Sequence, residues 1–198
     1  LPEQVEIPMW RHALISFPHP LLQQGLVILD TPGLNALGNE PELTVNMLPA
    51  AQAVLFVLAA DTGVTRSDLD MWERHVHRNS NSQHTKHLAI ALNKIDTLWD
   101  DLKDHGSVNA SIESQRRKVA ELLGVNNDRV FPVSAQKGLV GKVRDDEALL
   151  ERSRLLGLES FLADEVLPNK LDMLRDHILK EVGGLLDQTY SLLDNRLQ

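Results

Sequence analysis

Three short polar clusters in the chain combine residue types that can bind a nucleotide. The first, Asp30-Thr31-Pro32-Gly33, follows the apolar run 26–29. An aspartate after such a run can hold Mg²⁺ through a water molecule, because Mg²⁺ keeps much of its hydration shell. Gly33 lets its backbone amide approach a terminal phosphate closely. Aspartate, proline and glycine are also common turn residues, so an ordinary turn is the competing interpretation of this cluster.

The second cluster, Asn93-Lys94-Ile95-Asp96, also follows an apolar run. The Asp96 carboxylate can accept two parallel N–H bonds from guanine, one from the ring N–H and one from the exocyclic amine. Adenine presents no such donor pair, so the carboxylate would discriminate between the two bases. The aliphatic stem of Lys94 can lie along a base, and Asn93 can tie the loop to its neighbours. A solvated surface loop explains this tetrapeptide equally well.

The third cluster is Ser134-Ala135-Gln136-Lys137-Gly138. Ala135 is small enough for its backbone N–H to face a base carbonyl, and Ser134 can brace the preceding loop that bears the aspartate. Lys137 completes the candidate nucleotide-binding set. Taken alone, this cluster is the least specific of the three, and a plain loop is its default interpretation. The three together favour a nucleotide site, because all follow predicted buried strands.

The clusters must be positioned by the strands that precede them. Continuous apolar runs predict strands buried on both faces at 53–60, 87–92 and 129–133. Two shorter runs, 13–17 and 26–30, are separated by prolines and a glycine and predict an antiparallel pair. The expected fold class is α/β, with a mostly parallel sheet and flanking helices, and the polar clusters lie at the sheet edge where ligands bind.

In the segments between the predicted strands, apolar residues recur at helical spacing. This spacing predicts a helix over 65–78 with Ser67 as its N-cap, and a second over 111–124 with Gly124 as its C-terminal stop. From 168 to 198 leucine, isoleucine and valine recur three, four or seven residues apart. This last pattern predicts one long amphipathic helix.

Composition and charge exclude several classes of protein. The chain of 198 residues has 42% apolar and 24% charged residues, as in an ordinary globular protein. A net charge of −8 argues against a nucleic-acid partner, which requires a basic face. The chain has no cysteine, so disulfides and thiolate metal sites are impossible. The longest apolar run is too short to span a bilayer and no signal peptide is visible, so the expected location is cytoplasmic.

The quoted clusters resemble the nucleotide-binding motifs of the translation-factor-like P-loop GTPases. Within that class "VILDTPGLN" (27–35), the long first loop region and the trailing helix resemble the dynamin family, particularly its bacterial members. The resemblance implies a P-loop NTPase-like GTPase (G) domain, here incomplete, over 1–166. It implies that 167–198 begins a helical neck or bundle segment.

The same resemblance implies ligands, a cofactor and partners. GTP and GDP would be bound with Mg²⁺, which Asp30 would hold through water, and the intact parent protein would hydrolyse GTP. The family also implies self-association and membrane remodelling, with peripheral contact at the inner face of a membrane through regions outside these residues. Two alternatives stay open: an Era-like or ribosome-associated GTPase, and a non-catalytic pseudo-GTPase that serves as an interaction module.

Part of the expected GTPase machinery is absent from the sequence. The phosphate-binding sequence G-x-x-x-x-G-K-[ST] does not occur, and the first 30 residues contain no threonine to hold Mg²⁺. The chain begins with Leu1, and we expect it to be cut from a longer protein that carries the loop upstream; a parent that lacks the loop is the alternative. Leu34 stands where many small GTPases have a water-orienting glutamine. No catalytic residue is therefore assigned, and these residues alone are expected to be inactive.

Overall fold

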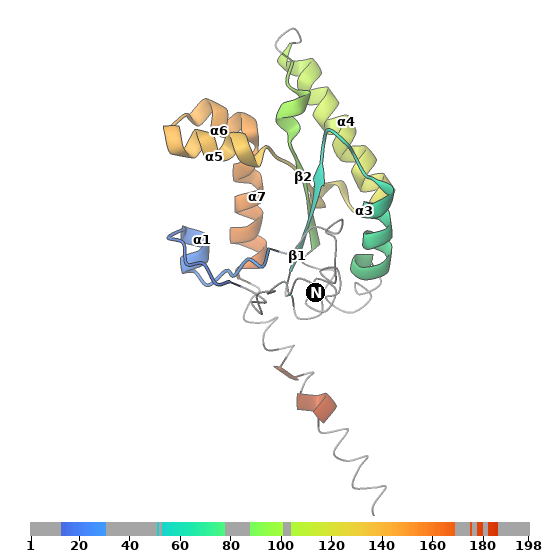
Figure 1. Cartoon of the computed structure of the whole chain (residues 1–198), viewed down its shortest axis with the longest axis vertical. Helices are drawn as coiled ribbons and strands as arrows, with labels where there is room; N and C mark the ends of the chain where they lie inside the picture. The colour runs from blue at the N-terminus through green and yellow to red at the C-terminus, as the bar shows by residue number, and fades with distance from the viewer. Residues whose placement is uncertain are drawn as a thin grey trace, which may run out of the picture.

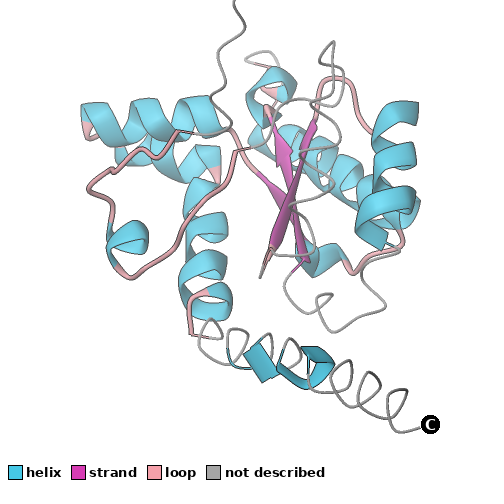
Figure 2. Ribbon diagram, turned by 60° about the horizontal axis from the view of Figure 1, so that its bottom comes forward, coloured by secondary structure: helices cyan, strands magenta, loops and turns pink. Residues whose placement is uncertain are grey.

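A parallel β-sheet forms the centre of the protein. The computed structural model describes residues 13–30, 51, 53–77, 88–100, 104–168, 175, 178–179 and 182–185. Within them the three strands are β1 (Val54–Ala59), β2 (Leu88–Asn93) and β3 (Val130–Pro132), in the order β1-β2-β3. Helices lie on both sides of this sheet (Figure 2). The predicted α/β class with a parallel sheet and flanking helices is confirmed.

The central strand β2 contributes to two apolar cores. Ile90 and Leu92 belong to the first core, whereas Ala89 and Ala91 belong to the second. This alternation follows from the pleat, which points successive side chains to opposite faces. Ile90 pairs in register with Phe56 of β1 and Val130 of β3. Burial on both faces is what a continuous apolar run predicts for a central parallel strand.

The first core lies between the sheet and three helical segments. These are α3 (Arg66–Met71), the π-helical turn η2 (Trp72–His77) and α4 (His105–Leu123). Trp72 from η2 packs into this core, and its indole Nε1 donates a hydrogen bond to the Leu123 carbonyl at 3.0 Å. That bond satisfies the polar atom of a buried aromatic ring and joins η2 to the end of α4.

The predicted starts of the two helices need correction. Thr65, not Ser67, is the N-cap of α3: its hydroxyl accepts from the Asp68 N–H at 3.3 Å, and the Asp68 carboxylate accepts from the Thr65 N–H at 2.8 Å. This reciprocal capping box satisfies two backbone donors, which a cap at Ser67 would leave unpaired. The second helix, α4, starts earlier than predicted, after the N-cap Asp104, and ends at Gly124 as predicted.

The second core lies on the opposite face of the sheet. Leu158 and Phe161 of α7 (Leu155–Phe161) and Val166 of the π-helical turn η7 (Leu162–Val166) pack with Ala89 and Ala91 there. Before α7, the chain forms α5 (Ala135–Arg144) and α6 (Glu147–Ser153). These two helices lie side by side at one end of α7 (Figure 1).

The predicted antiparallel pair of 13–17 with 26–30 is wrong. Neither run is a strand, and the short helix α1 (Pro20–Gln23) lies between them. Leu14, Ile15, Val27 and Ile28 are all exposed. A strand needs a neighbour for its backbone hydrogen bonds, and in the described part of the chain β1 pairs with β2 and with neither of these runs.

Most of the predicted C-terminal helix lies outside the described residues. The positions that are described, 175, 178–179 and 182–185, are helical. The domain division at 166/167 stays a prediction. In the described stretches of the chain, no helix combines the length and the apolar character needed to cross a membrane.

Candidate functional site

Two of the three polar clusters meet at the carboxyl ends of β2 and β3. These strands are parallel neighbours, so the loops that follow them leave the same edge of the sheet. The loop after β2 enters the 3-10 turn η5 (Ile95–Leu98), and the loop after β3 enters α5. The Ile95 N–H donates to the Val133 carbonyl at 3.2 Å, which holds the backbones of the two loops together.

Side-chain hydrogen bonds join these loops into one unit. The Ser134 hydroxyl donates to Asp96 Oδ1 at 2.6 Å, and Asn93 Oδ1 accepts from the Ala135 N–H at 3.0 Å and the Lys94 N–H at 2.8 Å. Ser134 is fully buried and Ala135 is exposed. The contacts that the sequence suggested for Ser134 and Asn93 are present, whereas the nucleotide-binding role of these residues stays a prediction.

Lys94 has a strained backbone. Its φ of 63° lies in the left-handed region, which is uncommon for a residue other than glycine and is often found at functional sites. The Thr97 hydroxyl donates to the Lys94 carbonyl at 2.8 Å, and Lys94 Nζ lies 3.5 Å from Asp61 Oδ2. The ion pair is exposed, so it orients the lysine more than it stabilises the fold.

Asp61 was not among the residues selected from the sequence. It follows β1, whose end lies at the same sheet edge as the loop after β2. The signal for it was available, because it is the first acid after the apolar run 53–60. Its contact with Lys94 adds the loop after β1 to the candidate site.

Lys137 has a backbone role in the third cluster. Its N–H donates to the Ser134 hydroxyl at 3.3 Å, so Ser134 is the N-cap of α5. The same hydroxyl thus accepts from the start of α5 and donates to Asp96. Ser134 therefore couples the position of the Asp96 carboxylate to the first turn of α5.

The first cluster is not brought to these loops by the described residues. Asp30 is exposed, and Thr31, Pro32 and Gly33 lie outside the part of the chain that is described. Across the described residues, no hydrogen bond or ion pair joins Asp30 to the loops after β2 and β3. The geometry therefore supports a common site for the second and third clusters and leaves the role of the first as a prediction.

Comparisons with known proteins identify a family that the chain resembles. A sequence model of the dynamin family matches residues 6–95, which include the first cluster and end one residue before Asp96. The isoniazid-induced protein IniA of Mycobacterium tuberculosis is 29% identical over 189 residues, covering 92% of this chain and 26% of that protein. The "Probable transmembrane GTPase FZO-like, chloroplastic" of Arabidopsis thaliana is 29% identical over 152 residues, covering 73% of this chain and 16% of that protein.

A bacterial dynamin-like protein of Nostoc punctiforme is 26% identical over 152 residues. That match covers 71% of this chain and 21% of the Nostoc protein. The chain thus spans about a quarter or less of the length of these three relatives. The family model over residues 6–95, these relatives and the parallel α/β sheet agree with one another, and the chain is therefore similar to proteins of the dynamin family.

Proposed function

We propose that the loops after β2 and β3 bind the guanine base of GTP and GDP. The observation that carries this proposal is the hydrogen bond from Ser134 to Asp96 Oδ1, together with the bonds that Asn93 accepts from Lys94 and Ala135. They hold a half-buried carboxylate at the exposed end of a rigid sheet. There Asp96 accepts from the ring N–H and the exocyclic amine of guanine. The Ala135 N–H, which donates to Asn93 Oδ1 in this structure, would turn to the base carbonyl when the nucleotide binds, and the Lys94 stem lies along the ring.

The phosphate and metal contacts belong to the first cluster in this proposal. Asp30 offers the hard carboxylate oxygen that Mg²⁺ prefers, and its exposure leaves room for a water-mediated contact. Thr31, Pro32 and Gly33 complete that part of the nucleotide site, with the Gly33 amide at the terminal phosphate. Mg²⁺ bound there would offset phosphate charge. Lys137, at the start of α5, contributes to the base side of the site.

GTP hydrolysis coupled to self-assembly and membrane remodelling is the activity we propose for the natural protein that contains this chain. Its support is the match of residues 6–95 to the dynamin family model and the names of two relatives, a GTPase and a bacterial dynamin-like protein. The general base stays unassigned, because Leu34 has no hydrogen-bonding group to orient water.

Replacement of Asp96 tests the proposed base specificity. In the natural protein, Asp96→Asn should weaken GTP binding about ten- to a hundredfold, because it removes one of two charge-assisted acceptors. It should strengthen binding of xanthosine triphosphate, whose carbonyl replaces the amine and can accept from the new amide. Equilibrium binding of GTP and of xanthosine triphosphate measures the switch. If self-assembly follows nucleotide binding, the sedimentation of assembled protein should depend on GTP for the unmodified protein and on xanthosine triphosphate for the variant.

Asp128→Asn is the matched control for this test. Asp128 is an exposed carboxylate in the turn η6 (Asn127–Arg129), which leads into the opposite end of β3. Its replacement changes the net charge by the same amount and should leave both affinities unchanged. Unchanged GTP affinity in Asp96→Asn would refute the guanine assignment.

A further inference from the structure

Three consecutive residues at the junction of α6 and α7 contact the loop after β2, the loop after β3 and helix α4. Ser153 ends α6, and Arg154 is both the C-cap of α6 and the N-cap of α7. The φ of Arg154 is 57°, so the chain turns sharply through the left-handed region there. This turn sends the groups of residues 152, 153 and 154 in different directions.

Ser153 holds the loop after β3. Its carbonyl accepts from the Ser134 N–H at 2.9 Å, and its hydroxyl donates to the Leu150 carbonyl at 2.5 Å. Ser153 is fully buried, and so is Ser134, whose hydroxyl donates to Asp96. A path of two hydrogen bonds thus leads from the α6–α7 junction to the Asp96 carboxylate.

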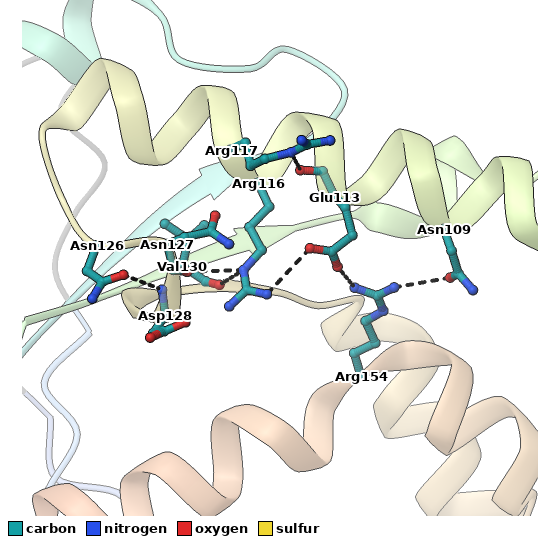
Figure 3. Close-up of polar contacts among 9 residues, drawn as sticks. All are labelled: Asn109, Glu113, Arg116, Arg117, Asn126, Asn127, Asp128, Val130 and Arg154. Carbon is teal, nitrogen blue, oxygen red and sulfur yellow. Dashed lines mark hydrogen bonds and ion pairs between the residues drawn. The ribbon is translucent and has the colours of Figure 1, made fainter.

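Arg154 ties the same junction to α4. Its Nη1 donates to Glu113 Oε1 at 2.7 Å and its Nη2 donates to Asn109 Oδ1 at 3.1 Å, and Figure 3 shows the guanidinium between these two side chains. Arg116 binds the other Glu113 oxygen at 3.4 Å and donates from Nε to the Val130 carbonyl at 2.8 Å. Glu113 therefore joins the junction to the beginning of β3.

The lowered pKa of Glu113 is consistent with its contacts to Arg154 and Arg116. Partial burial raises the pKa of Glu113, but the hydrogen bond and charge of Arg154, together with the charge of Arg116, bring it below its ordinary value. The carboxylate is thus held in its charged form by two guanidinium groups. Removal of Arg154 would leave it with Arg116 alone.

Arg152 contacts the loop after β2. Its guanidinium carbon lies 4.1 Å from the ring centroid of Trp99, a cation–π contact. The backbone N–H of Trp99 donates to the Asp96 carbonyl at 3.2 Å, so the backbone of residue 99 is fixed to the residue proposed to read guanine.

Close packing makes the junction a firm support for α5. A Cβ atom on Gly138 of α5 would lie 2.7 Å from Leu155 Cδ2 and 3.0 Å from the Ser153 hydroxyl oxygen. The absence of a side chain at Gly138 lets the first turns of α5 rest directly on the junction. A displacement of the junction would therefore move Ser134, the N-cap of α5.

We propose that Arg154 is a positioning residue for guanine recognition, which it serves by fixing the α6–α7 junction against α4. This inference rests on the proposed function of the loops after β2 and β3. Arg154 does not touch the base; it holds Ser153, which holds Ser134, which orients Asp96. Two parallel hydrogen bonds to guanine require both carboxylate oxygens in place, so a loosened junction weakens recognition of the exocyclic amine.

Discrimination between GDP and IDP tests this inference, because hypoxanthine lacks the exocyclic amine. In the natural protein, Arg154→Ala should reduce the ratio of the IDP to the GDP dissociation constant about three- to tenfold. Arg154→Gly, which suits the left-handed backbone, should show the same loss. Arg154→Lys should show a smaller loss, because an ammonium group can reach Glu113 but cannot fork to Asn109 as well.

Two further variants keep the test decisive. Arg144→Ala removes an exposed arginine from the last turn of α5 and should leave the ratio unchanged. Glu113→Gln keeps the shape of the acceptor but removes its charge, and it should lower the ratio even if the Arg154 variants do not fold. A purely structural role would weaken binding of both nucleotides equally and leave the ratio intact.

The outcomes separate this inference from the proposed function. If the unmodified protein prefers GDP and the folded Arg154 and Glu113 variants keep that preference, the positioning role is overturned. If the unmodified protein binds GDP and IDP equally, and Asp96→Asn has no effect, the guanine assignment itself fails.

Discussion

The two apolar runs 26–29 and 88–92 resemble each other in composition, and each leads into a polar cluster. The second forms β2, where Ile90 is 0% exposed, whereas in the first Ile28 is 69% exposed. β2 has a hydrogen-bonded strand on each side and an apolar core on each face. The run 26–29 has no strand beside it among the described residues. The comparison shows that an apolar run becomes a buried strand when neighbours on both sides satisfy its backbone.

The polar clusters that follow the two runs also differ because, in the part of the chain that is described, only the cluster after β2 follows a paired strand. Asn93 ends β2 and Asp96 follows it, and both are held by partners in the loop after β3. Asp30 follows a run that is mostly exposed, and no hydrogen bond or ion pair joins it to those loops in the described structure. A preorganised site thus requires the strand before it to be fixed, because hydrogen bonds to loops align only when both loops leave one rigid edge.

Equivalent substitutions in the two runs give the largest expected effect. Ile90→Ala should lower the free energy of unfolding of the 198-residue chain by about 2–5 kcal/mol, through lost burial and a residual cavity. Ile28→Ala should change it by less than about 0.5 kcal/mol, as is usual for an exposed position. Urea unfolding followed by circular dichroism measures both values. Comparable losses would mean that 26–29 is buried in solution.

Two glycines in helices provide a second contrast, between a tightly packed and an open position. A Cβ on Gly141 of α5 would lie 2.9 Å from the Leu150 backbone nitrogen, whereas Gly157 of α7 has no atom within 4 Å of such a Cβ. Gly141→Ala should therefore cost about 1–3 kcal/mol, since backbone atoms must move.

Gly157→Ala is its counterpart, and it should stabilise the protein by up to about 1 kcal/mol through helix propensity. Thermal unfolding of both variants should move the midpoint in opposite directions. Equal shifts would show that α5 and α6 are not in close contact.

The smallest expected effect is the pH dependence that Glu113 contributes. Its pKa in the folded protein lies below the ordinary value of 4.5, because the two arginines outweigh the effect of burial. The stabilisation is therefore complete above pH 4.5 and is lost as the pH falls through the lower folded pKa. The carboxylate is partly exposed, so the change should stay under about 1 kcal/mol.

Glu113→Gln provides the comparison for the pH measurement. Unfolding of the two proteins between pH 6 and 3 should show a steeper loss of stability for the unmodified chain. Parallel curves would indicate that the contact between Arg154 and Glu113 does not persist in solution.

The amino-acid sequence by itself determined the sheet and the chemistry of its edge. Continuous apolar runs identified β1, β2 and β3, because strands buried on both faces have no polar side to interrupt them. The clusters at Asn93 and Ser134 were readable as base-site candidates, because polar residues after buried parallel strands meet at one edge. The cap at Thr65 could also have been read, since Asp68 stands three residues later.

Only the tertiary structure decided which apolar runs are paired and what supports the loops after β2 and β3. Residues 135–166 form α5, α6, α7 and η7, which helical periodicity did not reveal because these segments are short and interrupted at Asp145 and Arg154. The contact of Arg154 with Glu113 spans 41 positions. Such long-range contacts depend on which surfaces the fold brings together. A local sequence pattern predicts whether a residue lies in a helix or a strand, but it does not predict which distant residue that side chain contacts.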